Sequence, residues 1–343
     1  MSFQKGSRDT AITLLHVIGM LMIFLCHSMQ VEKIYFLSEV LIAGVPLFLF
    51  VSGYLAGRKE IASIGRFWLG KAERILLPLV LLIAIVYSGY EMTGVATVTP
   101  FQWIFTLLNL QGLNYTYWKF EAFGAVAGCG HWWFLTTLMF CYLLTPLAQK
   151  FKKISLTGWR KALLIIGVLL AQLGLLFLGF QLSYIITFFF GYFIAGKPLR
   201  TDVKRYLSVT LLTAVAVFVR LVARVCIDGS ILYDRYISLV SGAVIAVFIF
   251  YTVHFLEKRF PQLFKVLDCA VIHFTERISY YFYLTHYLFL TGPFSTFRYI
   301  SNRPVAHVVA FVLSYITASL AFFIVNKGIL KLLKTRTATA DRR

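Results

Sequence analysis

Charged side chains are scarce in this sequence, and acidic ones are the scarcest. Asp, Glu, Lys and Arg supply 14% of the 343 residues, against about a quarter in a typical soluble domain. Only 14 residues are Asp or Glu, while 33 are Lys or Arg. Hydrophobic residues make up 59% of the chain, and the mean hydropathy is +0.80. This composition excludes an ordinary soluble domain and predicts an integral membrane protein that crosses the bilayer several times.

Cysteine is also rare, and the five cysteines do not have the spacing of a metal or redox motif. We therefore expect no metal site. Cys129 and Cys226 are both expected near the outer face, where a disulfide and two free, packed thiols are the alternatives. The first apolar segment lacks the small-residue cleavage site of a signal peptide, so we expect it to stay in the protein as a span.

Ten apolar segments are candidate membrane spans by their length. They predict an all-α bundle that forms a single transmembrane domain over residues 1–343, without an appended soluble domain. The predicted spans cover residues 11–29, 37–56, 75–92, 131–148, 162–180, 182–196, 207–225, 236–254, 278–292 and 305–326.

Basic residues recur in short clusters between the apolar segments. If the N-terminus is cytoplasmic, 26 of the 33 Lys and Arg residues lie on the inner side and 5 on the outer side. Cytoplasmic loops carry such an excess of Lys and Arg, so we expect both termini in the cytoplasm. Because the clusters do not gather into one patch, nucleic acid is not expected as a partner.

The segment 11–29 carries two ionisable side chains, His16 and His27. Eleven residues at about 100° each return to within roughly 20° of the start, so both histidines share one helix face, about 16 Å apart. An ionisable residue in a membrane helix is costly and by default lines a polar site. The imidazole of His27 suits general acid or base work, and a hydrogen bond to a neighbouring helix is the alternative.

A basic stretch, GRKEIASIGRFWLGKAERILLP, leads into the third predicted span. Lys71 and Arg74 lie three residues apart on one helix face, where they could share a phosphorylated ligand. The alternative is that these charges only follow the positive-inside rule.

Four further polar residues lie in apolar segments or at their ends. His131 begins an aromatic run that either faces an external substrate or forms an interfacial belt. Arg220 and Arg224 lie four residues apart on one face, which suggests an anion or sugar contact; snorkelling to the surface is an equal alternative. His286 lies well inside its span, where a pore residue and an interhelical hydrogen bond are equal alternatives.

Six stretches together resemble the acyltransferase-3 family of membrane O-acyltransferases. LLHVIGMLMIFLCHS and VPLFLFVSGYL match its first two motifs and place His27, Ser52 and Tyr54 on motif residues. KAERILLP, HWWFL, FFFGYFIAG and ISYYFYLTH match the other four. Where the family has Asp and then Arg or Lys ahead of the histidine, this sequence has Thr13 and His16. The resemblance covers nearly the whole chain, and ten spans are the architecture of the family.

The resemblance implies transfer of an acyl group from cytoplasmic acetyl-CoA, or another acyl-CoA, to a hydroxyl of a sugar or glycolipid outside the membrane. His27 would be the catalytic base, and His16, Lys71 and Arg74 would bind the acyl donor. The expected location is a bacterial cytoplasmic membrane, with its lipids as surroundings. The expected acceptor is a polysaccharide or lipid-linked glycan of the cell envelope. Whether the protein forms a homo-oligomer stays open. The expected substrate-binding residues are Ser52, Tyr54, His131, Arg220, Arg224 and His286.

Three questions stay open at this point. His27 could take the proton of the acceptor hydroxyl or carry the acyl group itself. A transporter or channel could use the same intramembrane histidines and arginines as a proton or anion path. The third alternative is an inactive relative, because His16 replaces a cation of the family motif; Lys5 or Arg8 could otherwise supply that charge.

Overall fold

The computed structural model describes residues 9–113, 125–153, 184–199, 201–230 and 232–329, together with 159, 166–167, 170 and 173–174. Regular secondary structure in these residues is helical throughout. The chain divides into two compact units. Unit 1 holds residues 1–60, 154–177 and 182–277, and unit 2 holds residues 61–153, 178–181 and 278–343.

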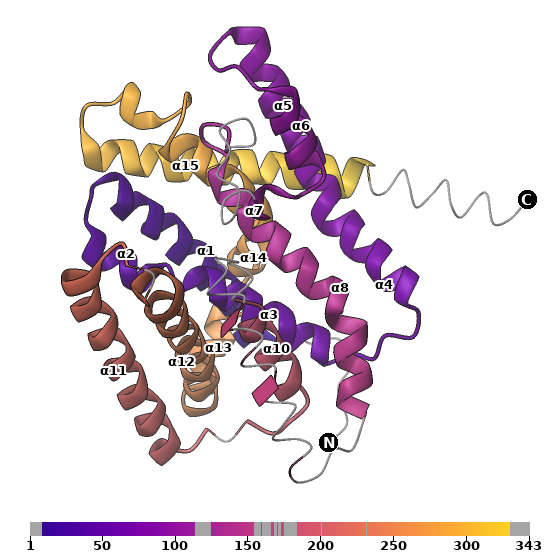
Figure 1. Cartoon of the computed structure of the whole chain (residues 1–343), viewed down its shortest axis with the longest axis vertical. Coiled ribbons are helices and arrows are strands. Elements are labelled where there is room, and N and C mark those ends of the chain that lie inside the picture. The colour runs from indigo at the N-terminus through magenta and orange to yellow at the C-terminus, as the bar shows by residue number, and fades with distance from the viewer. Residues whose placement is uncertain are drawn as a thin grey trace, which may run out of the picture. The chain divides into compact units, whose positions relative to one another are not determined.

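Unit 1 is built around three helices that pack on one another: α1 (Thr10–Val31), α3 (Gly44–Gly57) and α12 (Ser238–Arg259) (Figure 1). Leu15, Phe50 and Phe250 belong to the apolar core between them. The side chain of Asp9 caps α1 by accepting a hydrogen bond from the N–H of Ile12 at 3.2 Å. The unit also contains α2 (Tyr35–Leu41), α10 (Ile185–Ile194), α11 (Val203–Ile227), η6 (Tyr233–Ile237) and α13 (Pro261–Leu267).

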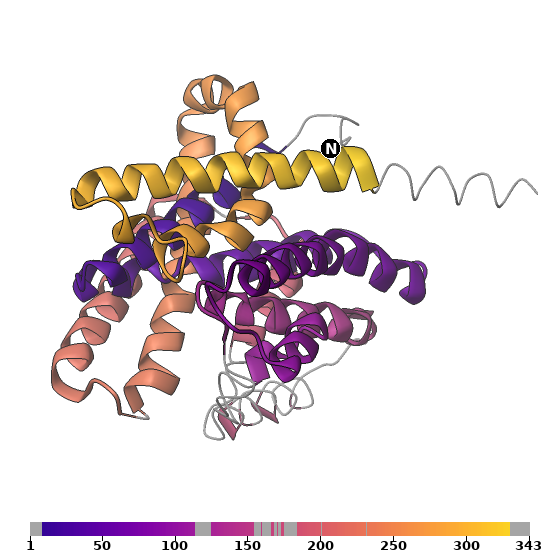
Figure 2. The same cartoon turned by 90° about the horizontal axis from the view of Figure 1, so that it is seen from above.

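Helices α11 and α12 lie side by side in unit 1, as Figures 1 and 2 both show. The π-helical turn η6 leads directly into α12 and packs against both helices. This pair carries Arg220, Arg224 and the residues that contact them.

Helices α3 and α10 approach each other closely at glycines. A Cβ atom on Gly53 would overlap the backbone of Phe188, and one on Gly191 would overlap the backbone of Phe50. Only glycine leaves room for backbones at this distance. Two of the stretches that carry the family resemblance, VPLFLFVSGYL and FFFGYFIAG, therefore form one helix–helix contact.

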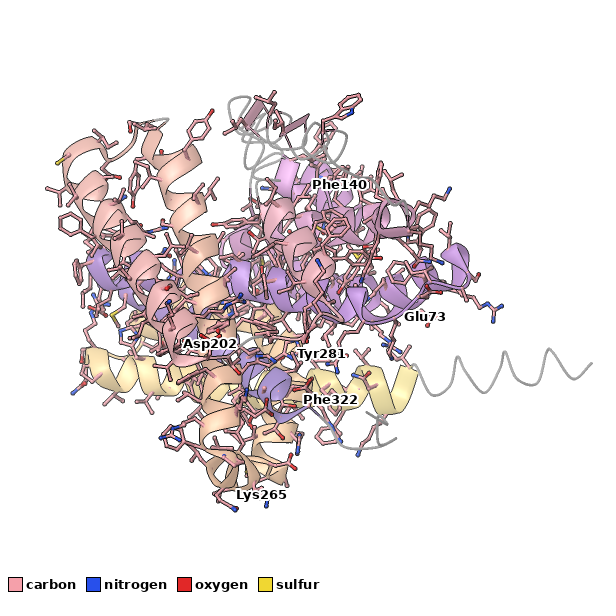
Figure 3. The ribbon with its side chains drawn as sticks, turned by 90° about the horizontal axis from the view of Figure 1, so that it is seen from below. Glu73, Phe140, Asp202, Lys265, Tyr281 and Phe322 are labelled. Carbon is pink, nitrogen blue, oxygen red and sulfur yellow. The ribbon has the colours of Figure 1, made fainter. Side chains whose placement is uncertain are left out.

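Unit 2 contains α8 (Trp133–Lys153) and the continuous helical segment formed by α4, η1 and α5. It also contains α14 (Ala270–Leu290) from Ile278 onward. Figure 3 shows Tyr281 of α14 beside Phe322 of α15, with the ring centroids 5.8 Å apart. The remaining elements are α4 (Ile64–Lys71), η1 (Ala72–Leu76), α5 (Leu77–Thr93), α6 (Pro100–Leu107), α7 (Gln111–Leu113), η4 (Gly130–Trp132), η7 (Thr296–Arg298), α15 (Arg303–Phe322) and η8 (Phe323–Ile329).

The π-helical turn η1 joins α4 to α5 and ends just before Pro78. Proline has no N–H, so the regular bond to the carbonyl of Arg74 cannot form there. The carbonyl of Ile75, within the turn, accepts a hydrogen bond from the hydroxyl of Tyr280 at 2.6 Å. The irregular turn is thus held by a side chain of α14, and such turns often mark functional sites.

Among the described residues, six helices are long and apolar enough to cross a membrane, which supports a helical membrane bundle. They are Thr10–Val31, Tyr35–Gly57, Ile64–Thr93, Val203–Ile227, Ser238–Arg259 and Arg303–Ile329.

Several helices differ in length from the predicted spans. The segment 37–56 is divided between α2 and α3 by a turn at Ile42 and Ala43. The helix predicted over 75–92 begins at Ile64, because the π-helical turn continues α4 into α5. Helix α10 has 10 residues, about half the number needed to cross the hydrocarbon core. Most of the predicted span 162–180 lies outside the described residues.

Candidate functional site

His27 lies near the C-terminal end of α1, with Nδ1 2.8 Å from the side-chain oxygen of Gln30. The amide nitrogen of Gln30 lies 3.6 Å from Sγ of Cys26, which turns the amide oxygen towards the imidazole. An amide oxygen only accepts hydrogen bonds, so Nδ1 of His27 carries a proton and Nε2 is the basic nitrogen. A histidine held in one tautomer by an acceptor on its other nitrogen is the arrangement of a general base.

His16 lies on the same helix, about 16 Å along the axis from His27. Its Nδ1 is 3.8 Å from a carboxylate oxygen of Glu276, and its ring centroid is 5.9 Å from that of Phe48. The side chain is 16% exposed. A carboxylate therefore already lies beside the residue that was predicted to contact the acyl donor.

Ser52 and Tyr54 lie on α3, one on each side of the close contact at Gly53. Ser52 is half-buried. The ring of Tyr54 meets Phe250 edge to face at 5.0 Å, and the guanidinium of Arg58 lies 5.6 Å from its centroid. In this arrangement Tyr54 joins α3 to α12, and a role in substrate binding stays a prediction.

Arg220 is fully buried, and each of its three guanidinium nitrogens donates a hydrogen bond to a protein oxygen. Nε lies 2.8 Å and Nη2 2.6 Å from one carboxylate oxygen of Glu39. Nη1 binds the carbonyl of Ser238 and, at 2.9 Å, the hydroxyl of Ser241, and Nη2 binds the hydroxyl of Ser238 at 3.0 Å. The structure thus gives Arg220 the role of a buried tie between α2, α11 and α12.

Arg224 lies one turn further along α11 and is 28% exposed. It pairs with Asp228 and lies 3.8 Å from the second carboxylate oxygen of Glu39. Its guanidinium also lies 5.3 Å and 5.7 Å from the ring centroids of Tyr35 and Tyr233. The hydroxyl of Tyr233 donates to Glu39. Burial, together with this hydrogen bond, raises the pKa of Tyr233, so it remains a neutral donor.

Lys71 and Arg74 lie in unit 2 on either side of the start of η1. The Nζ of Lys71 lies 3.8 Å from the ring centroid of Tyr142 and 5.6 Å from that of Phe67. Arg74 is exposed and makes no hydrogen bond or ion pair with the part of the chain that the structure describes. Cation–π contact holds Lys71 in place, while the guanidinium of Arg74 is available for an anionic ligand.

His131 and His286 form a buried cluster in unit 2, with ring centroids 4.8 Å apart. Nε2 of His131 and Nδ1 of His286 each lie 2.8 Å from the carbonyl oxygen of Tyr283. A carbonyl only accepts, so both nitrogens carry protons. The hydroxyl of Tyr283 donates back to the carbonyl of His131. The bonds between His131 and Tyr283 fasten η4 to α14. The bonds of His286 to Phe282 and Tyr283 stay within α14, and its role as a pore residue or an interhelical tie stays a prediction.

The predicted site residues are divided between the two units. His16, His27, Ser52, Tyr54, Arg220 and Arg224 lie in unit 1, and Lys71, Arg74, His131 and His286 lie in unit 2. Sequence reasoning did not single out the partners Gln30, Glu39, Glu276, Tyr233 and Tyr280. Two of them left a signal: Gln30 follows His27 by three residues on one helix face, and Glu39 is an acidic residue within an apolar segment.

The geometry describes a helical membrane protein with an oriented histidine in its first span. The chain belongs to the acyltransferase-3 family, because the sequence model of the family's Acyltransferase domain matches residues 9–325. The match confirms the resemblance seen in the six motif stretches. It supports acyl transfer at a membrane as the activity. Comparisons with curated proteins and with solved structures found no match.

Proposed function

We propose that this acyltransferase moves an acyl group, acetyl in the simplest case, from cytoplasmic acetyl-CoA to a hydroxyl of an extracytoplasmic polysaccharide or lipid-linked glycan. The observation that supports this most directly is His27, held by Gln30 as a general base within a chain of the acyltransferase-3 family. The proposal includes ten spans and a bacterial cytoplasmic membrane as the location. It also places both termini in the cytoplasm, which the distribution of Lys and Arg favours.

In the proposed reaction, Nε2 of His27 accepts the proton of the acceptor hydroxyl as the oxygen attacks the thioester carbonyl. The C–S bond then breaks, and the proton returns from His27 to the CoA thiolate. Gln30 contributes by keeping the imidazole in the tautomer that leaves Nε2 basic. In the alternative course, Nε2 attacks the thioester first and an acyl-histidine passes the acyl group to the hydroxyl. Both courses need the same tautomer.

Arg74 is the strongest candidate for the donor end of the proposed site. It is exposed, lies beside the π-helical turn and is expected on the cytoplasmic side, where CoA would enter. Lys71, close by, adds positive charge. His16 is the weaker candidate, since the carboxylate of Glu276 at 3.8 Å would compete with a phosphate for its imidazole.

The test uses purified protein in liposomes with radiolabelled acetyl-CoA and a glycan extract, and it follows CoA release and label transfer. We expect His27→Ala to abolish transfer. Gln30→Leu should lower kcat, and Gln30→Glu, which keeps an acceptor beside Nδ1, should retain more activity. Arg74→Gln should raise the KM for acetyl-CoA with a smaller change in kcat.

His273→Ala is the matched control, because His273 also pairs with an acceptor, Asp268 at 2.6 Å, but outside the predicted site residues. Unchanged turnover in His27→Ala would remove His27 from the chemistry. If wild-type protein neither binds acetyl-CoA nor releases CoA with any extract, acetyl transfer itself is excluded as the function.

A further inference from the structure

Three side chains in unit 1 bring an imidazole and two carboxylates together at the start of α1. One ligand atom each from Asp9, His254 and Glu257 lies within 4.8 Å of the other two. His254 and Glu257 lie three residues apart near the end of α12, and Asp9 is the N-cap of α1. The cluster could not be predicted from sequence, because Asp9 lies more than 240 residues before His254 and Glu257.

The imidazole of His254 is held in an orientation that suits a metal ligand. Its Nδ1 lies 2.9 Å from the carbonyl oxygen of Phe250, so Nδ1 is protonated and Nε2 is the nitrogen with a free electron pair. The ring packs against Phe250 at 4.3 Å and against Tyr54 at 6.4 Å. Metal-binding histidines commonly donate their other N–H to a backbone carbonyl in this way.

The two carboxylates have partners that an ion would have to share. Oδ1 of Asp9 accepts from the N–H of Ile12 at 3.2 Å, and Oδ2 lies 2.8 Å from Nη1 of Arg58. Glu257 is hydrogen-bonded to the backbone at Ala11. Each carboxylate oxygen has two lone pairs and can bind a cation while it accepts one hydrogen bond. Arg58 is 34% exposed and lies at a helix end, so its guanidinium can turn away.

We propose that Asp9, His254 and Glu257 bind a divalent transition-metal cation of the Zn²⁺ or Mn²⁺ type. Imidazole and carboxylate donors suit these ions, and three protein ligands leave a coordination position for water. Ligand atoms at about 2.1 Å from one tetrahedral ion lie about 3.4 Å apart. From separations of up to 4.8 Å, the side chains therefore close by up to about 1.4 Å when the ion binds. The ion would brace the first turn of α1, the helix that carries His16 and His27, against the last turn of α12.

The experiment measures metal binding by the full-length, tag-free protein in detergent. Zn²⁺ is titrated in competition with a chromophoric chelator, and Co²⁺ is added as a spectroscopic probe of the ligands. We expect about one Zn²⁺ per chain and visible d–d bands from Co²⁺. Glu257→Gln and His254→Ala should each weaken Zn²⁺ binding at least tenfold and remove the Co²⁺ bands. Arg58→Gln should strengthen binding several-fold, because the competing cation is lost.

The matched control is His273→Ala, which removes a histidine–carboxylate pair that has no third ligand among the described residues. It should bind Zn²⁺ like the wild type. Thermal unfolding of each variant without metal shows whether it is folded, and Glu257→Gln keeps the shape of the side chain. The proposal is overturned if the wild type binds no Zn²⁺. It is equally overturned if the cluster variants lose thermal stability but bind Zn²⁺ like the wild type, because the carboxylates would then only cap α1.

Discussion

The polar side chains at the candidate site have different kinds of hydrogen-bond partner in the two units. In unit 1 the important contacts join one side chain to another: His27 to Gln30, Arg220 to Glu39, and Arg58 to Asp9. In the histidine cluster and at the π-helical turn of unit 2 they join side chains to main-chain carbonyls: His131 and His286 to Tyr283, Trp132 to Leu284, and Tyr280 to Ile75.

This difference separates residues that can respond from residues that hold the fold. A side-chain partner can change its rotamer or charge when a proton or ligand arrives, whereas a helix carbonyl keeps its position and its role as acceptor. We therefore expect reactivity to depend on the side-chain pairs of unit 1. The histidine cluster of unit 2 should affect stability first.

The largest expected effect is that of His27→Ala on acyl transfer. Loss of a positioned general base lowers rates by about 10²- to 10⁴-fold, and loss of a nucleophile would lower them further. The readout is label transfer per folded protein, with folding checked by thermal unfolding. The comparison between the units fails if His131→Phe lowers the rate as much as His27→Ala without lowering stability.

Arg220→Met should be the most destabilising substitution among the charged residues of unit 1. It leaves the buried carboxylate of Glu39 without its main partner, which costs about 3–5 kcal/mol. Arg224→Met should cost about 1 kcal/mol or less, because Arg224 is partly exposed and its pairs are screened by solvent. Thermal unfolding in detergent measures both. Equal effects of the two substitutions would contradict the assignment of Arg220 as the buried tie, and Glu39→Gln combined with Arg220→Met should recover part of the loss.

In unit 2, His131→Phe should lower the free energy of unfolding by about 1–3 kcal/mol. The substitution keeps an aromatic ring but removes the bond to the carbonyl of Tyr283, which also accepts from His286. Thermal unfolding gives the change, and donor affinity is measured separately by titration with acetyl-CoA. A lower affinity at unchanged stability would make His131 a ligand contact and remove the contrast with unit 1.

The smallest expected effect is that of Tyr280→Phe, about 0.5–1.5 kcal/mol, because one hydrogen bond to Ile75 is lost while the ring stays. Proteolysis between α4 and α5 should increase as the π-helical turn loosens. Tyr281→Phe is the matched control on the neighbouring residue, since its hydroxyl binds Asn326 and not the turn. Similar proteolysis in both variants would show that Tyr280 does not hold η1.

Much of the fold could be predicted from sequence because apolar length and the distribution of Lys and Arg are local properties. Two features were missed. The turn at Ile42–Ala43 lies within apolar residues, so it leaves no hydropathy signal. The early start at Ile64 leaves none either, because a polar helix continues through a π-helical turn into the apolar one. The family could be recognised from His27, Ser52 and Tyr54 because motif residues are adjacent in sequence.

Partners that depend on the tertiary structure could not be predicted. Glu276 reaches His16, and Glu39 reaches Arg220, only because helices far apart in sequence pack together. The same limit explains why Arg220 was expected at an anion or a sugar and is found with its guanidinium bound to Glu39, Ser238 and Ser241. The roles of the predicted donor and acceptor residues stay predictions.

The glycine contact between α3 and α10 has a mechanical consequence for turnover. At Gly53 and Gly191 the two backbones touch, so there is no layer of side chains that could let one helix slide or roll on the other. Helices α3 and α10 should therefore move as one rigid body. Any conformational change that admits a bulky donor or releases a product has to move both helices together. Its hinge must therefore lie outside this helix pair.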